Sequence, residues 1–169
     1  LTPQQAWGTA IAAAVTAQEV ALAAWAASSA AALGERALEL WEQVPDAEAV
    51  AGVQRPLLLS RTSRALHFAG RMDRAIELAQ QALDEWPEDD RVGLAELLGR
   101  FSFTAGQSGV GDALELAERG LALLRPDDDP GVRAGILLEL ERALLMRNEF
   151  ERTIEVGTEA FEHAMSAGE

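Results

Sequence analysis

Small apolar residues recur along this chain about every forty residues, and a bulky apolar residue accompanies each. Four stretches share a small residue at their first and eighth positions and a bulky residue at the ninth. They begin at Ala30, Ala75, Ala113 and Thr153, so successive starts are 45, 38 and 40 residues apart. A period of this length is typical of stacked supersecondary units, which build extended surfaces for partners and seldom carry chemistry.

Within the period the apolar residues follow a helical spacing. In residues 72–86 they stand at 72, 75, 76, 79, 82 and 83, which places them on one helix face. Sustained alternation of apolar and polar residues, which would indicate strands, is missing. The pattern predicts eight helices that pair as four antiparallel hairpins. They cover residues 3–26, 28–44, 57–69, 72–86, 92–105, 112–124, 132–146 and 150–165, with a break near 26–28.

Capping and loop residues support these bounds. Residues 2–5, Thr-Pro-Gln-Gln, combine an N-cap, a proline in the first turn and a capping-box glutamine. Asp90 and Asp129 are further predicted N-caps, and a proline follows the second directly. Residues 45–56, with two prolines and a glycine, are predicted to form a connector, and residues 106–111 a flexible loop.

Composition narrows the classes of function. The chain has 169 residues, 49% of them apolar, which suffices for one folded domain with a continuous core. Its formal charge is -14 and its fourteen basic residues are all Arg, so we expect no binding to a nucleic-acid backbone. Cysteine is absent, which excludes disulfides and cysteine-based metal or catalytic sites and fits a cytoplasmic location.

The chain is expected to form a single helical-repeat domain over residues 1–169. No signal peptide is expected, and the most apolar window, residues 20–33, is too short to span a bilayer, so we expect no membrane association. Both ends look cut from something longer, which predicts a fragment of a larger chain. The repeats are placed at about 3–44, 55–87, 91–125 and 130–167.

The second hairpin resembles a tetratricopeptide repeat. Gly70, Ala75, Ala82 and Pro87 fall where that family has its glycine, two alanines and closing proline. The small residues allow the second helix to approach its neighbours closely, and the proline ends it. The resemblance implies an all-α fold, a right-handed superhelix of about four tetratricopeptide-like helix hairpins, or α-solenoid.

The repeat is longer than the usual tetratricopeptide one, and in this it resembles the helical-repeat region of large ATP-dependent LuxR-type, maltose-regulator-like transcriptional regulators. Residues 35–48, Glu-Arg-Ala-Leu-Glu-Leu-Trp-Glu-Gln-Val-Pro-Asp-Ala-Glu, are the nearest single match, and the resemblance extends from about Trp7 to the end. Such regulators carry an ATPase module before the repeats and a helix-turn-helix module after them. This chain has no Lys for a Walker loop and no basic recognition helix. The resemblance therefore implies a sensor and assembly region, with ATP and DNA binding left to other parts of a parent protein.

A row of arginines is the candidate binding site. Counted back from each repeat's small residue, Arg64, Arg100 and Arg142 are assigned to one equivalent position on three first helices. In tetratricopeptide folds that position faces the concave groove, where guanidinium groups could bind carboxylates or phosphates. Alternatively, each arginine pairs with a glutamate on a neighbouring helix. The neighbouring groove positions are His67, Phe68, Glu96, Phe103 and Leu145.

Other polar groups suggest no chemistry. His67 and His163 are isolated, without a nucleophile or a ligand cluster near them in sequence. The acidic runs 88–90 and 127–129 lack the spacing of a calcium loop and are explained by helix capping. We therefore expect no catalytic residue, metal or cofactor, and no enzyme activity.

The four tryptophans have two expected roles. Trp41 and Trp86 occupy equivalent sites at the ends of second helices, where packing between repeats is the expected role and ligand stacking the alternative. Trp7 and Trp25 lie in the Ala-rich start and are expected to be exposed if a preceding repeat is cut away.

The expected function is a non-enzymatic protein-interaction, sensing and oligomerisation module of a LuxR-type regulator, with a protein or peptide partner. One alternative is a small-molecule effector site inside the superhelix, lined by Arg64, His67, Phe68, Arg100 and Phe103. Another is a pure oligomerisation scaffold, in which residues 7–25 or 150–165 form an apolar contact of more than about 1,000 Å².

Overall fold

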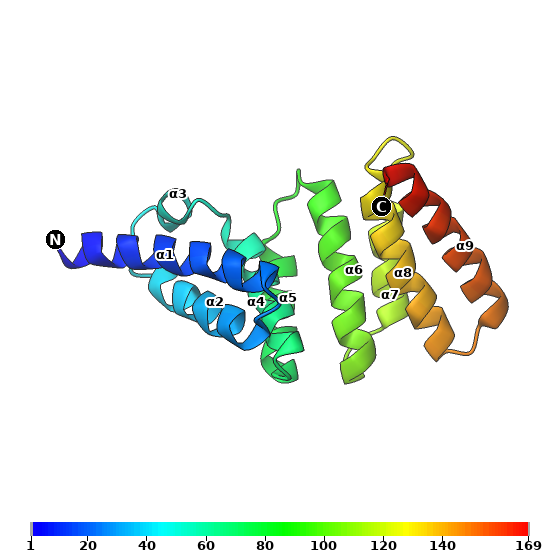
Figure 1. The fold of residues 1–169 in the computed structure, drawn as a ribbon, viewed down its shortest axis with the longest axis horizontal. Coiled ribbons are helices and arrows are strands. Elements are labelled where there is room, and N and C mark those ends of the chain that lie inside the picture. The colour runs from blue at the N-terminus through cyan, green and yellow to red at the C-terminus, as the bar shows by residue number, and fades with distance from the viewer. Residues whose placement is uncertain (1, 169) are drawn as a thin grey trace. The chain divides into compact units, whose positions relative to one another are not determined.

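A computed structural model describes residues 2–168, and in that range helices joined by short loops account for the whole fold (Figure 1). The prediction of an all-α protein is confirmed. Nine helices lie in the described range, one more than the sequence pattern predicts. They are α1 (Pro3–Ala23), α2 (Ala27–Trp41), α3 (Ala47–Ala51), α4 (Arg55–Phe68), α5 (Met72–Glu85), α6 (Arg91–Ser108), α7 (Ala113–Leu123), α8 (Pro130–Met146) and α9 (Phe150–Ala167).

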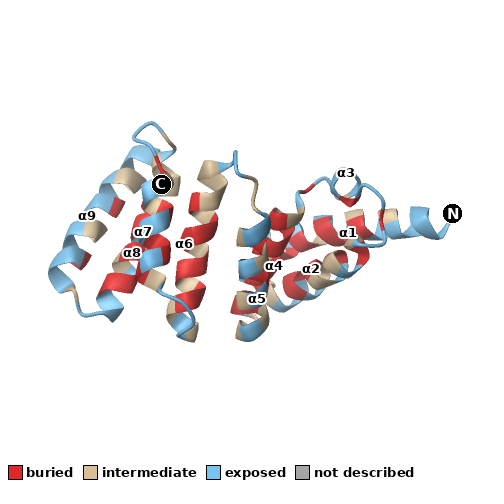
Figure 2. Ribbon diagram, turned by 180° about the vertical axis from the view of Figure 1, so that it is seen from behind, coloured by how far each residue is buried: buried red, intermediate tan, exposed pale blue. Residues whose placement is uncertain are grey.

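Consecutive helices pack as four hairpins, α1 with α2, α4 with α5, α6 with α7, and α8 with α9. The hairpins form two compact units: unit 1 ends at Trp86 and unit 2 begins at Pro87. Within unit 1, α2 also packs on α4, and the short α3 packs on α1. Within unit 2, α8 packs on both α6 and α7. Each unit therefore has its own buried layer between paired helices (Figure 2).

The recurring small residues lie where paired helices meet. Ala30, Ala37, Ala75 and Ala82 are all completely buried in unit 1. In unit 2 the third repeat has Gly120 at the corresponding position, where a Cβ atom would lie only 3.0 Å from the carbonyl oxygen of Ala95. The backbones of α6 and α7 therefore approach more closely than an alanine would allow, which explains the glycine in this repeat.

The caps follow the sequence prediction. The Thr2 hydroxyl accepts from Gln5 N at 3.3 Å, and Gln5 Oε1 accepts from Thr2 N at 2.9 Å, a complete capping box. Asp90 and Asp129 accept from backbone N–H groups at the starts of α6 and α8, at 2.9 Å and 2.8 Å. Gly70 ends the α4 turn at a φ of 77°, a left-handed conformation in which glycine avoids strain.

Two connections differ from the prediction. The connector 45–56 contains the helix α3, because Ala47 and Val53 are drawn into the core that α1, α2 and α4 share. The expected loop at 106–111 begins only after Ser108, so Gly106 is helical. At Gly106 the Cβ position lies 3.4 Å from Ala113 Cβ, so packing against the next helix holds this last turn of α6 in place.

The first break in the chain lies close to its predicted place. Trp25, at a φ of 56°, turns the chain between α1 and α2, one residue before the predicted range of 26–28. Its side chain is 78% exposed and that of Trp7 is 36% exposed, as the sequence suggests. Trp41 packs against the core of unit 1, which confirms its packing role.

Matching hydrogen bonds set the register between hairpins. Ser63 Oγ donates to the Ala75 carbonyl oxygen, and Ser102 Oγ donates to that of Ala113, both at 2.7 Å. Ser63 and Ser102 are thus equivalent, which fixes an offset of 39 residues between the first helices of these hairpins. The same offset places buried leucines at 59, 98 and 137 in α4, α6 and α8. Among residues 2–168 no helix is both long enough and apolar enough to cross a bilayer.

Candidate binding site in unit 2

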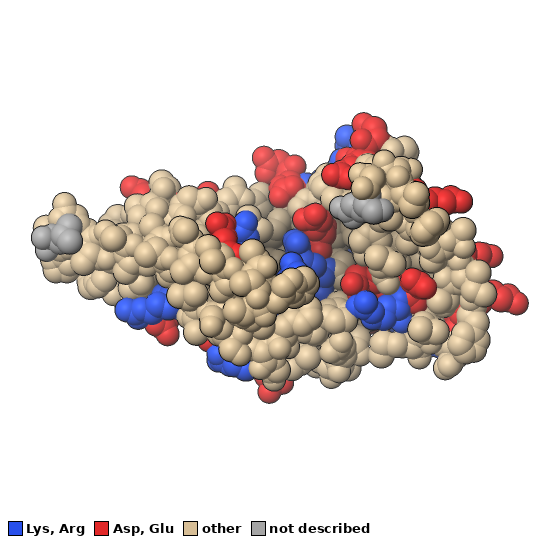
Figure 3. Space-filling view, in the orientation of Figure 1, with Lys and Arg blue, Asp and Glu red and all other residues tan. Residues whose placement is uncertain are grey.

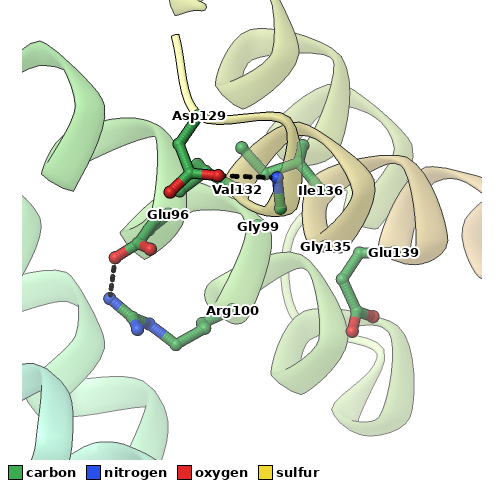
Figure 4. Close-up of a pocket in the computed structure, with 9 residues that line it drawn as sticks. Glu96, Gly99, Arg100, Asp129, Val132, Gly135, Ile136 and Glu139 are labelled. Carbon is green, nitrogen blue, oxygen red and sulfur yellow. Dashed lines mark hydrogen bonds and ion pairs between the residues drawn. The ribbon is translucent and has the colours of Figure 1, made fainter. Parts of the chain in front are cut away.

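An open hollow of about 450 Å³ lies between α6 and α8 in unit 2. Figure 4 shows its lining, with side chains from α6 on one side and from the start and middle of α8 on the other. A volume of this size falls within the usual range of ligand sites, about 300–1,000 Å³. It is lined by Glu96, Gly99, Arg100, Asp129, Gly131, Val132, Gly135, Ile136 and Glu139.

Small residues leave this space open. Gly135, on the exposed side of α8, has no atom within 4 Å of its Cβ position. The Ile136 side chain packs against Gly99, with 3.1 Å between Ile136 Cγ1 and the Cβ position of Gly99. Both residues line the hollow, and Val132 adds a further apolar side chain. The sequence thus combines a close helix contact at Gly99 with open space around Gly135. The floor of the hollow, at Val132 and Ile136, is apolar.

The rim carries three carboxylates and one guanidinium group. Arg100 Nη2 lies 3.5 Å from Glu96 Oε2, one helical turn away, so these two charges offset each other. Asp129 is engaged in capping α8. Burial raises the pKa of the Glu139 carboxyl above its ordinary value, and the nearby Arg142 guanidinium opposes this only in part. The hollow is therefore acidic overall, and Glu139 is its most desolvated charged group described.

Beyond Glu139 an aromatic ring and an arginine continue the same surface. The Arg142 guanidinium lies over the Phe103 ring, 4.5 Å from its centroid, a cation–π geometry. Arg142 Nη1 also donates to Glu139 Oε2 at 2.9 Å. The Phe103 ring and the Glu139 carboxylate thus fix the position of the Arg142 guanidinium group on this surface.

Three other predicted groove residues belong to unit 1, whereas Leu145 lies exposed on α8 of unit 2. Arg64 is exposed on α4, and Phe68 is 53% exposed at its end. His67 is buried, and burial lowers the pKa of its imidazole, so the ring is neutral at pH 7. The His67 and Phe68 rings meet edge to face, with centroids 5.1 Å apart and an interplanar angle of 73°.

The structure groups the predicted site residues by unit. It brings Arg100, Phe103 and Arg142 to one surface of unit 2, and it places Arg64, His67 and Phe68 together at the end of α4. That the two sets line a single groove stays a prediction. Arg100 and Arg142 do pair with glutamates, but with Glu96 and Glu139 of their own helices, so pairing with a neighbouring helix stays a prediction.

The 39-residue register corrects one equivalence. Phe103, rather than Arg100, aligns with Arg64 and Arg142. The equivalence failed because Arg64 and Arg142 lie 11 residues before the small residues of their repeats, whereas Arg100 lies 13 before Ala113. Aligned correctly, Arg100 corresponds to Glu139, a rim residue that the sequence analysis missed. The left-handed residues that end α4, α6 and α8, at 70, 109 and 148, would have given this register.

No family model matches the chain, and no curated protein matches it. Its function must therefore be inferred from the helix hairpins and from the hollow in unit 2.

Proposed function

We propose that this chain is a non-enzymatic interaction and sensing module, a right-handed superhelix of tetratricopeptide-like hairpins from a cytoplasmic LuxR-type transcriptional regulator. The four hairpins and the 39-residue offset between first helices support the repeat architecture. The regulator assignment rests on the resemblance of residues 35–48 and on the length of the repeat. In such a parent, ATP and DNA would be bound by other modules.

The observation that carries the binding role is the hollow between α6 and α8. Its apolar floor at Val132 and Ile136 and its acidic rim at Glu96 and Glu139 suit a ligand with an apolar group beside a cationic one. A cationic ligand group next to Glu139 would add to the contact that Arg142 already makes and would further offset the cost of burying this carboxylate. Both a peptide side chain and a small-molecule effector can offer such a pair of groups.

A titration followed by NMR tests this role with two matched probes. The probes are the capped tripeptides acetyl-Arg-Leu-Arg-amide and acetyl-Glu-Leu-Glu-amide, and the reporters are the amide signals of Gly99, Gly131 and Gly135. We expect saturable shifts with the cationic probe and none with the acidic one. Glu139→Gln should weaken the cationic response several-fold. Absence of a saturable response to the cationic probe would contradict a cation-accepting site here.

The arginines give the experiment its second arm. If Arg100 and Arg142 bound anionic groups, as the sequence first suggests, the acidic tripeptide would shift these signals instead. The pairing of both arginines with glutamates favours the cationic probe, because their charges are already partly neutralised.

A further inference from the structure

The outward face of the last hairpin is apolar and exposed. On α9 the exposed side chains follow a spacing of four, seven and four residues, so they form one stripe along the helix. Two leucines of α8 extend the same kind of surface. This acceptor face consists of Leu138, Leu145, Phe150, Ile154, Phe161 and Met165, each between 50% and 71% exposed.

The hairpin of α6 and α7 shows how an equivalent face is covered by a further helix. Leu114 and Ala117 of α7 are 8% and 0% exposed, because α8 packs over them with Leu137, Leu140 and Leu144. Their counterparts forty residues later are Ile154, which is 71% exposed, and Gly157. Ile154 is thus left uncovered on α9 where α7 has a buried leucine, whereas Gly157 is half-buried beside Glu141. The outward side of α9 is largely exposed in Figure 2.

Helix α1 has the complementary character. Its outer stripe is exposed and carries no charged residue: Ala6, Thr9, Ala13, Thr16 and Val20. The two hydroxyls of this stripe each donate to the backbone carbonyl four residues earlier, at 3.0 Å, so the threonines leave their methyl groups for contact. In Figure 3 the surface over α1 is almost without charged side chains. A helix that is apolar on both its inner and outer sides is typical of a buried position.

The side chains of the α1 stripe and of the acceptor face are complementary in size, small on α1 and large on the acceptor face. Ala6 and Ala13 stand seven residues apart on α1, as Leu138 and Leu145 do on α8, and both pairs are exposed. Within unit 2 the helices already combine large with small, since Ile136 Cγ1 lies 3.1 Å from the position that a Cβ atom of Gly99 would occupy. Alanines set against leucines would reproduce this fit with the sizes exchanged.

Charge selects the partner of the acceptor face. Glutamates at 151, 155 and 162 border the stripe on α9, so two α9 helices brought together would repel each other. Helix α1 contains a single charged residue, Glu19, which already pairs with Arg61 at 2.6 Å. The acceptor face therefore tolerates α1 far better than a second α9.

We propose that the acceptor face binds helix α1 of a second copy of this chain, in the way that α8 packs on α6 and α7. The contact is heterologous, because different surfaces of the two copies meet. Every copy carries both an α1 and an acceptor face, so association does not stop at a dimer of free ends. The proposal is independent of ligand binding between α6 and α8, since the two sites share no residue.

Sedimentation equilibrium of the chain, from about 10 μM to about 1 mM, tests the proposal, since interfaces of modest area dissociate in this range. The average mass should rise with concentration past that of two chains. Ala13→Glu should block the α1 side and Ile154→Glu the acceptor side, each weakening association at least tenfold by burying a charge in an apolar contact. Ala122→Glu, on the exposed side of α7, is the matched control and should associate like the unchanged chain.

Mixing the two blocked variants separates this arrangement from all others. Ala13→Glu retains a free acceptor face and Ile154→Glu a free α1, so an equimolar mixture should form pairs of chains and nothing larger. Circular dichroism checks that each variant is folded, and Val20→Glu with Phe161→Glu provides a second pair. A chain that stays monomeric at 1 mM overturns the proposal, as does a dimer that survives Ala13→Glu and Val20→Glu.

Discussion

The replacement Gly34→Ala should destabilise unit 1, although alanine is the better helix former. Gly34 lies on α2 and is buried beside a polar contact in which Gln18 Nε2 donates to Thr62 Oγ1 at 2.9 Å. A Cβ atom at position 34 would lie 2.2 Å from both of these atoms and 2.9 Å from Thr62 Cγ2. Gln18 and Thr62 are both completely buried, so neither side chain can swing out into solvent.

Opposing effects set the magnitude. Alanine gains about 1 kcal/mol over glycine inside a helix. Forcing one extra carbon into a packed core costs about 1–3 kcal/mol. If the Gln18–Thr62 hydrogen bond breaks, about 1 kcal/mol more is lost, because Gln18 still contacts the Ala30 carbonyl and Thr62 still donates to that of Leu58. The net loss should be about 1–3 kcal/mol of the free energy of unfolding of unit 1.

Tryptophan fluorescence during urea unfolding measures this loss selectively. All four tryptophans, at 7, 25, 41 and 86, belong to unit 1, whereas circular dichroism at 222 nm reports on both units. Gly8→Ala is the control in the same unit, because its nearest contact would be an ordinary 3.4 Å to Val50 Cγ1. It should leave the fluorescence midpoint unchanged or raise it.

One result would refute the reasoning. If Gly34→Ala is as stable as the unchanged chain, the three helices must separate at little cost, and the buried contact is not tight. A double replacement sharpens the test: in a background where Gln18 and Thr62 are both Ala, the crowded atoms are gone. There Gly34→Ala should be neutral or stabilising.

The remaining predictions concern two carboxylates of unit 2. Arg91 donates to Asp128 at 2.6 Å and 2.7 Å and lowers the pKa of that carboxyl well below its usual range. This stabilisation is present above the ordinary Asp pKa of about 3.9 and is lost as the pH falls further. Asp128→Asn should therefore flatten the loss of stability between about pH 4 and pH 2, seen by circular dichroism in urea; an unchanged pH profile would exclude this ion pair as its source. Glu139 affects the pH dependence of stability in the opposite direction, because burial raises its pKa. Its contribution to stability is present at low pH and is lost as the pH rises through the pKa of the folded state. Glu139→Gln should therefore unfold at a higher urea concentration than the unchanged chain at pH 7, despite the lost pair with Arg142. The difference between the two should vanish near pH 3.5. A variant that is less stable at pH 7 would show that the ion pair contributes more than the burial of Glu139 costs.

Local sequence signals predicted the elements well where a single residue decides the backbone. The capping box at Thr2, the caps at Asp90 and Asp129 and the turn at Gly70 all depend on atoms within a few residues of each other. The helix α3 was missed because its five residues form no periodic pattern, and burial of Ala47 and Val53 in a core built by other helices holds it. The last turn of α6 was missed for a similar reason, since Gly106 reads as a loop residue until α7 packs beside it.

The candidate site was predicted in part. Arg100, Phe103 and Arg142 do share a surface, because first helices of successive hairpins lie side by side within unit 2. The expected binding of anions by these arginines assumed free guanidinium groups. Helix spacing instead brings Glu96 to Arg100 and Glu139 to Arg142, four and three residues away, and three carboxylates and one guanidinium group line the hollow.

The sequence by itself determined the helices, their pairing and the small residues at their contacts, because periodicity and capping act over one or two helical turns. The register of 39 residues was overlooked in the small residues, although the turn residues at 70, 109 and 148 carry it, and the matching bonds of Ser63 and Ser102 establish it. Tertiary structure alone decided which ion pairs join distant residues, such as Arg91 and Asp128, and which apolar faces remain uncovered. Those outcomes depend on distances between helices, as along α9, and no local pattern in the chain encodes them.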